Sequence, residues 1–160
     1  MATIHIMHGF IGFGKTTTAK KIAKEHSAVR LEIDGFMAKL FGRNPISDGF
    51  WHYSEPIKDL IWDIAKETIN NGTDVVIDHG FWTKQQRQDV WKRAKQITPN
   101  VVFHVIKCDM EVAKARAISR TLNNKDTLNI DGADFDSQKN QFEPIQADEA
   151  KNYEIVYHSN

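Results

Sequence analysis

The stretch HGFIGFGKTTT, residues 8–18, restricts the possible fold of this chain more than any other. Gly9, four further residues, and then Gly14, Lys15 and Thr16 match the spacing G-x-x-x-x-G-K-[ST] of a Walker A loop. An apolar run with strand character precedes the loop, and a pattern with the period of a helix follows it. In that order, backbone N–H groups and the positive end of the helix converge on one point, where they bind a phosphate group. The sequence therefore predicts a nucleotide phosphate-binding loop.

Each residue type in this loop suits phosphate binding. Glycines let the backbone turn so that successive N–H groups face the phosphate oxygens. Lys15 is expected to reach the β- and γ-phosphates of ATP, and the Thr16 hydroxyl to bind Mg²⁺. The expected nucleotide-binding residues are Gly9, Gly12, Phe13, Gly14, Lys15, Thr16 and Thr17.

The length and composition predict one domain that spans residues 1–160. Of these 160 residues 41% are hydrophobic, enough for one core but not for two. Lys plus Arg and Asp plus Glu both number 21, so the formal charge is zero and we do not expect a nucleic acid as the partner. No stretch approaches the roughly 18 apolar residues of a membrane span, and the N-terminus lacks a signal-peptide pattern. Neither membrane insertion nor secretion is therefore expected.

The cysteine and histidines predict neither a disulfide nor a zinc site. Cys108 is the single cysteine, which excludes an internal disulfide and a cysteine-rich metal site and favours the cytoplasm. The histidines stand at positions 5, 8, 26, 52, 79, 104 and 158, and none of them form a pair at the helical spacing of metal ligands. We therefore expect most of them to be surface or half-buried residues, and no structural zinc.

Short runs with strand character alternate with helical patterns along the chain. This order predicts an α/β fold with three layers, in which helices cover a five-stranded parallel sheet. The expected strands are residues 3–8, 28–34, 73–78, 100–108 and 153–158. The expected helices are residues 15–26, 35–41, 54–71 with Ser54 as its cap, 83–97 and 110–122. Between them, we expect residues 42–53 to form a substrate lip and residues 123–133 a mobile polar loop that orders when ligand binds.

Asp34 is expected at the carboxyl end of the second strand, the edge where parallel sheets place their ligands. A carboxylate there could accept the proton of an acceptor alcohol during phosphoryl transfer and orient the alcohol oxygen. Alternatively, Asp34 caps the helix that follows. Glu32, two residues earlier on the same face of the strand, is a second candidate for the base.

Asp78 ends the apolar run VVID in the manner of a Walker B carboxylate. We expect it in the active site, where it either holds the water shell of Mg²⁺ or binds the acceptor. His79, Phe81 and Trp82 follow on the loop above the sheet. Their rings either stack on a ring or sugar of the acceptor or pack the loop onto the helices.

Arg116 and Arg120 are four residues apart on an expected helix and therefore share one face. Two guanidinium groups there could clamp the γ-phosphoryl group as charge shifts during transfer, which is the task of lid arginines in P-loop kinases. The alternative is a solvated basic face that includes Lys114. Lys84 and Arg87 are expected on a solvent face.

Together these motifs resemble the predicted-kinase branch of the AAA-like P-loop ATPases. The resemblance rests on the Walker A loop, on EID in the second strand, on DHGFW after the third strand and on FEPIQADE near the C-terminus. That family is similar to chloramphenicol phosphotransferases, zeta toxins and the kinase domain of polynucleotide kinases. The resemblance implies that the aspartate matching Asp34 is a general base. The family's usual FEPP appears here as Phe142, Glu143, Pro144 and Ile145, which indicates a divergent adenine or lid region.

These features favour an ATP-dependent kinase that transfers the γ-phosphate of Mg·ATP to a hydroxyl group of a small molecule. The expected catalytic residues are Asp34, Lys15, Arg116 and Arg120, and the expected Mg²⁺ ligands are Thr16 and Asp78. Three alternatives stay open: an NTPase module that changes shape for a partner, a polynucleotide 5′-kinase, and a zeta-like toxin that phosphorylates a nucleotide sugar. The sequence does not identify the acceptor, because the segments that bind the acceptor vary independently of the residues that bind the phosphates.

Overall fold

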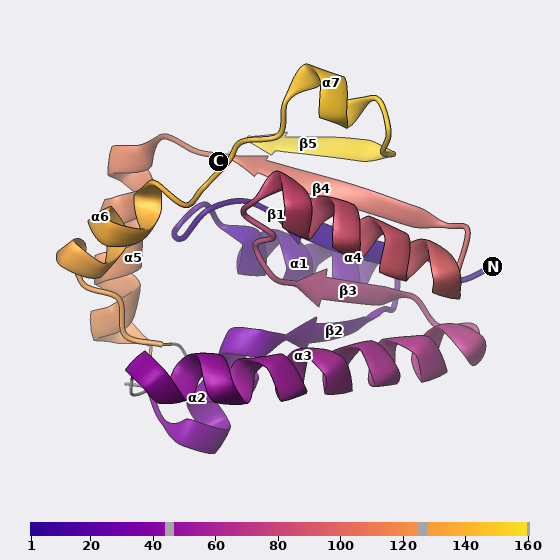
Figure 1. The fold of residues 1–160 in the computed structure, drawn as a ribbon, viewed down its shortest axis with the longest axis horizontal. Coiled ribbons are helices and arrows are strands. Elements are labelled where there is room, and N and C mark those ends of the chain that lie inside the picture. The colour runs from indigo at the N-terminus through magenta and orange to yellow at the C-terminus, as the bar shows by residue number, and fades with distance from the viewer. Residues whose placement is uncertain (44–46, 125–127, 160) are drawn as a thin grey trace.

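The fold is built on a sheet of five parallel strands in the order β2-β3-β1-β4-β5 (Figure 1). The computed structural model describes residues 1–43, 47–124 and 128–159. The sheet is in register from one strand to the next, with Ile4 opposite Val75 on one side and Val101 on the other. The strands are β1 (Ile4–His8), β2 (Val29–Glu32), β3 (Val75–Asp78), β4 (Val101–Lys107) and β5 (Ile155–Ser159).

The inner strands are apolar on both faces because helices cover both faces. All residues of β1 and β3 are buried. One core cluster joins Ile4 and Ile6 to residues of α3 (Ser47–Asn70) and α4 (Lys84–Ile97). A second cluster joins Met7 to residues of α1 (Lys15–Glu25) and α5 (Met110–Asn123) on the opposite face. The predicted three-layer α/β fold with a five-stranded parallel sheet is thus confirmed.

All the loops that leave the carboxyl ends of the strands lie at one edge of the sheet, the left edge in Figure 1. The loop after β1 lies there, together with α5 and α6. The candidate functional site lies at this edge. The remaining helices are α2 (Ile33–Phe41), α6 (Gly132–Lys139) and α7 (Ala147–Ala150).

The expected boundaries differ from the structure around the second strand. The strand expected through Asp34 ends at Glu32, and α2 begins at Ile33. Asp34 therefore lies in the first turn of a helix, still at the carboxyl edge of the sheet, rather than at the end of a strand. The apolar residues of both elements pack into the same core, so hydrophobicity alone did not mark the change from strand to helix.

The third helix begins earlier than expected. It starts at Ser47, and Ser54, which was expected to cap it, is fully buried inside it. Pro56 also lies inside the helix. Much of the expected lip, residues 42–53, is thus helical, and residues 44–46 of it lie outside the described residues.

The expected polar loop, residues 123–133, is bounded by helices on both sides. Asn123 is the last residue of α5, and α6 begins at Gly132 with a capping box between Asp131 and Asp134. Residues 125–127 of the expected loop lie outside the described residues. In the described parts of the chain, no helix is both long and apolar enough to cross a membrane.

Candidate active site

The loop between β1 and α1 has a backbone conformation that favours glycine at two positions. Gly12 and Gly14 have φ angles of 76° and 96°, which side chains of L-residues rarely adopt. A Cβ atom on Gly12 would also lie 2.1 Å from the carbonyl oxygen of Ala113 in α5. Gly12 and Gly14 therefore set the turn, and Gly12 also lets α5 approach the loop.

Lys15 is the first residue of α1 and folds back over this loop. Its Nζ donates a hydrogen bond to the carbonyl oxygen of Phe10 at 2.7 Å, and the backbone N–H of Phe13 donates to the same oxygen at 3.3 Å. Burial lowers the pKa of Lys15 to about 8, although the nearby carboxylates of Asp78 and Asp34 act in the opposite direction. The ammonium group thus lies at the loop, with two carboxylates close to it.

The two threonines after Lys15 lie in the first turn of α1. Thr16 is half-buried and Thr17 is exposed. No side chain caps the start of this helix, whose N-cap is Gly14. The N-terminal end of α1 is therefore open toward the loop, as anion binding requires.

The carboxylate of Asp34 makes no hydrogen bond or ion pair with any residue that the structure describes. As a whole residue, Asp34 is exposed to solvent. Desolvation of the carboxylate raises its pKa, and Glu32 adds to the effect, whereas Lys15 and Arg120 oppose it. Asp34 does not cap α2, because the N-cap is Glu32 and no side chain caps the helix.

The second candidate base, Glu32, is engaged elsewhere. Its Oε2 forms an ion pair with Nη1 of Arg30. A Cβ atom on Gly35 would lie 2.2 Å from Oε1 of Glu32, so the glycine makes room for this side chain. Of the two carboxylates weighed from the sequence, Asp34 is the one without a partner in the described chain.

Asp78 is the last residue of β3 and is 6% exposed. Its Oδ2 accepts a hydrogen bond from Nη1 of Arg30 at 2.7 Å. Burial raises the pKa of Asp78, against the opposing effects of Lys15 and Arg30. A carboxylate here and the Thr16 hydroxyl supply the oxygen ligands that Mg²⁺ prefers, so the two residues fit this ion.

The two arginines of α5 have different surroundings. Arg120 is half-buried, and its charge affects the pKa of both Lys15 and Asp34. Its Nε is buried and has no hydrogen-bond partner in the described chain. Arg116 is exposed and donates to Sγ of Cys108 at 3.6 Å. The structure thus brings Arg120 to Lys15 and Asp34 and leaves Arg116 outside this cluster.

A pocket of about 250 Å³ lies beside the phosphate loop. Phe142 and Pro144 of the FEPI segment form part of its wall, and the ring of Phe142 stacks on that of His8 at a centroid distance of 5.4 Å. Burial lowers the pKa of His8 to about 4, and the charge of Arg87 adds to this effect. The divergent segment near the C-terminus is therefore a wall of this pocket. The pocket is lined by His8, Phe13, residues 105–108, Met110, Phe142, Pro144 and Ile145.

A second cavity, of about 220 Å³, lies between the sheet, α3 and α4. His79 and Phe81 line it, while Trp82 packs on Phe10 at a centroid distance of 5.0 Å. Only two of the three residues weighed for acceptor stacking therefore face a cavity. Its polar lining includes Glu55, Lys58, Asp59, Gln86, Asp89 and Arg93.

Sequence reasoning placed Arg87 on a solvent face, and this was wrong. Arg87 is fully buried and forms an ion pair with Glu149 of α7, with Nε 2.7 Å from Oε1. The helical spacing held a signal for this burial, because Arg87 shares one face of α4 with the buried Val90 and Ala94. Lys84 is exposed, as expected.

Comparison with known proteins agrees with the family that the phosphate loop and the parallel sheet indicate. The family model described as AAA domain matches residues 4–145. The chain is 26% identical over 144 residues to a shikimate kinase of Enterococcus faecalis, an alignment that covers 86% of this chain and 82% of the relative. These two matches support the resemblance to P-loop kinases that the motifs indicated.

Solved structures share the fold. A crystal structure from Chloroflexus aurantiacus, named only as a candidate kinase, has a TM-score of 0.75 at 12% identity and covers 99% of this chain and 88% of that one. A chain of the Pnkp1/Rnl/Hen1 RNA repair complex has a TM-score of 0.73 at 23% identity and covers 88% of this chain and 43% of that one. At these identities the structures establish the fold alone. With the family model matched from the first strand to the FEPI segment, the chain belongs to the AAA domain family.

Proposed function

We propose that this protein is a kinase that transfers the γ-phosphoryl group of Mg·ATP to a hydroxyl group of a small molecule. The observation that carries the proposal is Asp34, whose carboxylate has no partner in the described chain and lies close to Lys15 of the phosphate loop. An NTPase needs only a positioned water, whereas a kinase needs a base that can receive an acceptor proton. The raised pKa of Asp34 brings its basicity closer to neutral pH, which favours proton acceptance.

In the proposed reaction the acceptor oxygen attacks the γ-phosphorus, and the bond between this phosphorus and the bridging oxygen of ADP breaks. Asp34 accepts the acceptor proton, and the electron pair of the broken bond stays on ADP. Lys15 neutralises charge on the β- and γ-phosphates, and Arg120 neutralises charge that shifts during transfer. Mg²⁺ at Thr16 and Asp78 would supply further positive charge to the phosphates. Arg116 reaches the phosphates only if α5 moves.

The two pockets suit the two substrates. Phe142 and Phe13 give the pocket beside the loop flat apolar walls, which suit the adenine ring of ATP. The cavity between α3 and α4 borders the active site, because Ile33 precedes Asp34 and His79 follows Asp78. Its charged and amide side chains can hydrogen-bond a hydroxylated acceptor.

The acceptor class is tested by incubating the protein with γ-labelled ATP and Mg²⁺. Separate reactions contain shikimate, fractionated cell metabolites, an RNA oligonucleotide with a 5′-hydroxyl group, or water alone. The proposal expects label in a small molecule, and none above background with Lys15→Ala. Label found only in inorganic phosphate would show a hydrolytic module instead. Label on the RNA would show a polynucleotide kinase instead.

A further inference from the structure

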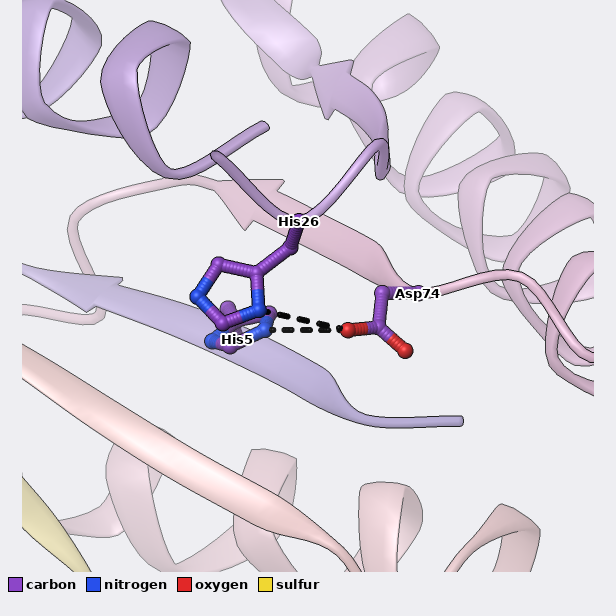
Figure 2. Close-up of side chains that lie close together, drawn as sticks. All are labelled: His5, His26 and Asp74. Carbon is purple, nitrogen blue, oxygen red and sulfur yellow. Dashed lines mark ion pairs between the residues drawn. The ribbon is translucent and has the colours of Figure 1, made fainter. Parts of the chain in front are cut away.

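Two histidines and an aspartate meet at the edge of the sheet opposite the phosphate loop (Figure 2). His5 lies near the start of β1, His26 follows α1, and Asp74 precedes β3. His5 Nε2 and His26 Nδ1 each lie 3.6 Å from the same oxygen, Oδ2 of Asp74. Figure 2 shows both rings turned toward this oxygen. One atom from each of the three residues therefore points at a common centre, and all three atoms lie within 4.8 Å of one another.

His5 supplies the observation that points to a ligand. The residue is 4% exposed, and its Nε2 is buried without a hydrogen-bond partner in the described chain. The distance of 3.6 Å to Asp74 is too long for a hydrogen bond. A buried ring nitrogen without a partner is destabilising, and this one is aimed into the cluster. An ion bound among the three atoms would give the nitrogen the partner that the protein does not.

The other ring nitrogen of His5 lies within hydrogen-bond distance of a second histidine. His5 Nδ1 lies 3.0 Å from Nε2 of His104, and His104 Nδ1 lies 2.9 Å from Nε2 of His158. If each Nδ1 carries the proton and donates along this row, His5 Nε2 has a free electron pair. A hydrogen bond from the second ring nitrogen is the support that metal-bound histidines have in known sites.

The carboxylate of Asp74 is also oriented by a hydrogen bond. Its Oδ1 accepts a hydrogen bond from the backbone N–H of Thr3 at 2.8 Å, so Oδ2 is the oxygen that faces the histidines. Thr3 and Asp74 precede neighbouring strands, which fixes the carboxylate relative to His5. The acidic group is thus oriented before any ion binds.

We propose that His5 Nε2, His26 Nδ1 and Asp74 Oδ2 form a binding site for one zinc-like divalent transition-metal ion. Two imidazoles and one carboxylate suit Zn²⁺ and its neighbours in the first transition series rather than Mg²⁺, which prefers oxygen ligands. In a tetrahedral zinc site with bonds of 2.0–2.2 Å, neighbouring ligand atoms are about 3.3–3.6 Å apart. The two separations between Oδ2 of Asp74 and the histidine nitrogens are 3.6 Å, which matches this value, and the two nitrogens lie within 4.8 Å of each other. His26 is half exposed, which leaves a water molecule access to the fourth position.

This site is independent of the proposed kinase reaction. Its residues stand at the amino ends of β1 and β3, whereas Lys15 and Asp78 stand at the carboxyl ends. The ion would tie the end of α1 to the start of β1 and the start of β3, which already pair with each other in the sheet. The expected consequence is stabilisation of the fold, because an ion that binds only the folded chain shifts the unfolding equilibrium.

The test uses nucleotide-free protein stripped of metal with a chelator. Zn²⁺ binding is measured by calorimetry, and Co²⁺ binding by the visible absorption that distinguishes a tetrahedral site. We expect one equivalent of each ion to bind, and the melting temperature to rise by about 5 °C or more at a Zn²⁺ concentration near 100 times Kd. His26→Ala and Asp74→Asn are each expected to weaken Zn²⁺ binding by more than about 100-fold, beyond the effect of losing an outer-shell partner. His26 is half exposed, so its variant should fold.

His52→Ala is the matched control, because it removes an exposed histidine from α3 without touching the cluster. Its Zn²⁺ affinity should equal that of the wild type. Wild-type protein that binds Zn²⁺ no more tightly than His26→Ala would overturn the proposal. So would Zn²⁺ binding that survives His26→Ala and disappears in Asp78→Asn, because the ion would then lie at the phosphate-loop edge.

Discussion

Arg87 and Glu149 form a bidentate ion pair in the interior, with Nε 2.7 Å from Oε1 and Nη2 2.7 Å from Oε2. Both side chains are 1% exposed. The remaining nitrogen of Arg87 donates to the carbonyl oxygens of Trp82 and Glu143 at 2.9 and 2.8 Å. This arginine therefore holds α4, the loop after β3 and the segment around α7 together. That segment includes the wall of the pocket beside the phosphate loop.

Removing either partner of this pair should destabilise the protein strongly. Arg87→Ala or Glu149→Ala leaves an uncompensated buried charge, which costs about 3–5 kcal/mol of unfolding free energy. Urea denaturation followed by circular dichroism measures this loss. Lys84→Ala removes an exposed ion pair with Asp148 on the same two helices and should change the midpoint little. Equal midpoints for Arg87→Ala and Lys84→Ala would mean that the buried pair does not hold these elements.

Thr16→Ala should weaken the binding of Mg·ATP far more than that of ATP with a chelator. The reason is that the hydroxyl group serves the metal ion, whereas the backbone of the loop serves the phosphates. Calorimetric titrations of the wild type and the variant, each with and without Mg²⁺, make the comparison. Equal losses in both titrations would remove Thr16 from the metal shell.

The affinity for ATP should fall as the pH rises above about 8. Burial lowers the pKa of Lys15 to about 8 in the free protein, so above this pH the side chain must take up a proton when the phosphates bind. Below this pH the lysine is already charged and contributes no pH dependence. Titrations at several pH values measure the slope. Lys15→Arg keeps its charge throughout this range, so any binding that it retains should not show the decline.

Arg120→Ala should slow phosphoryl transfer by about 10³-fold or more while leaving ADP affinity nearly unchanged, if Arg120 acts mainly in the transition state. Arg116→Ala provides the comparison, because Arg116 lies on the same helix but donates to Cys108. A smaller loss for Arg116→Ala would match the arrangement of the structure. If both variants lose activity equally, α5 must move and carry both arginines to the phosphates.

The sequence predicted the parts of the site that follow from local patterns. The phosphate loop could be predicted from its motif. The location of Asp34 and Asp78 at the carboxyl edge of the sheet could be predicted as well, because residues at the ends of parallel strands meet at one edge. The burial of Arg87 was missed, because its partner Glu149 is distant in the sequence and lies in a helix of four residues that has no clear pattern. No short sequence pattern marks the cluster of His5, His26 and Asp74 either, since each residue comes from a different part of the chain. Pairings of this kind depend on the packing of the whole chain.

The most direct measurement of the central claim is the rate of label transfer from γ-labelled ATP to the acceptor in Asp34→Asn. This change keeps the size of the side chain but removes the charge that accepts the proton. The account predicts ATP affinity equal to that of the wild type and a transfer rate lower by roughly 10² to 10⁴. Transfer at the wild-type rate would contradict the role of Asp34 as the base and, with it, the account of this site as a kinase centre.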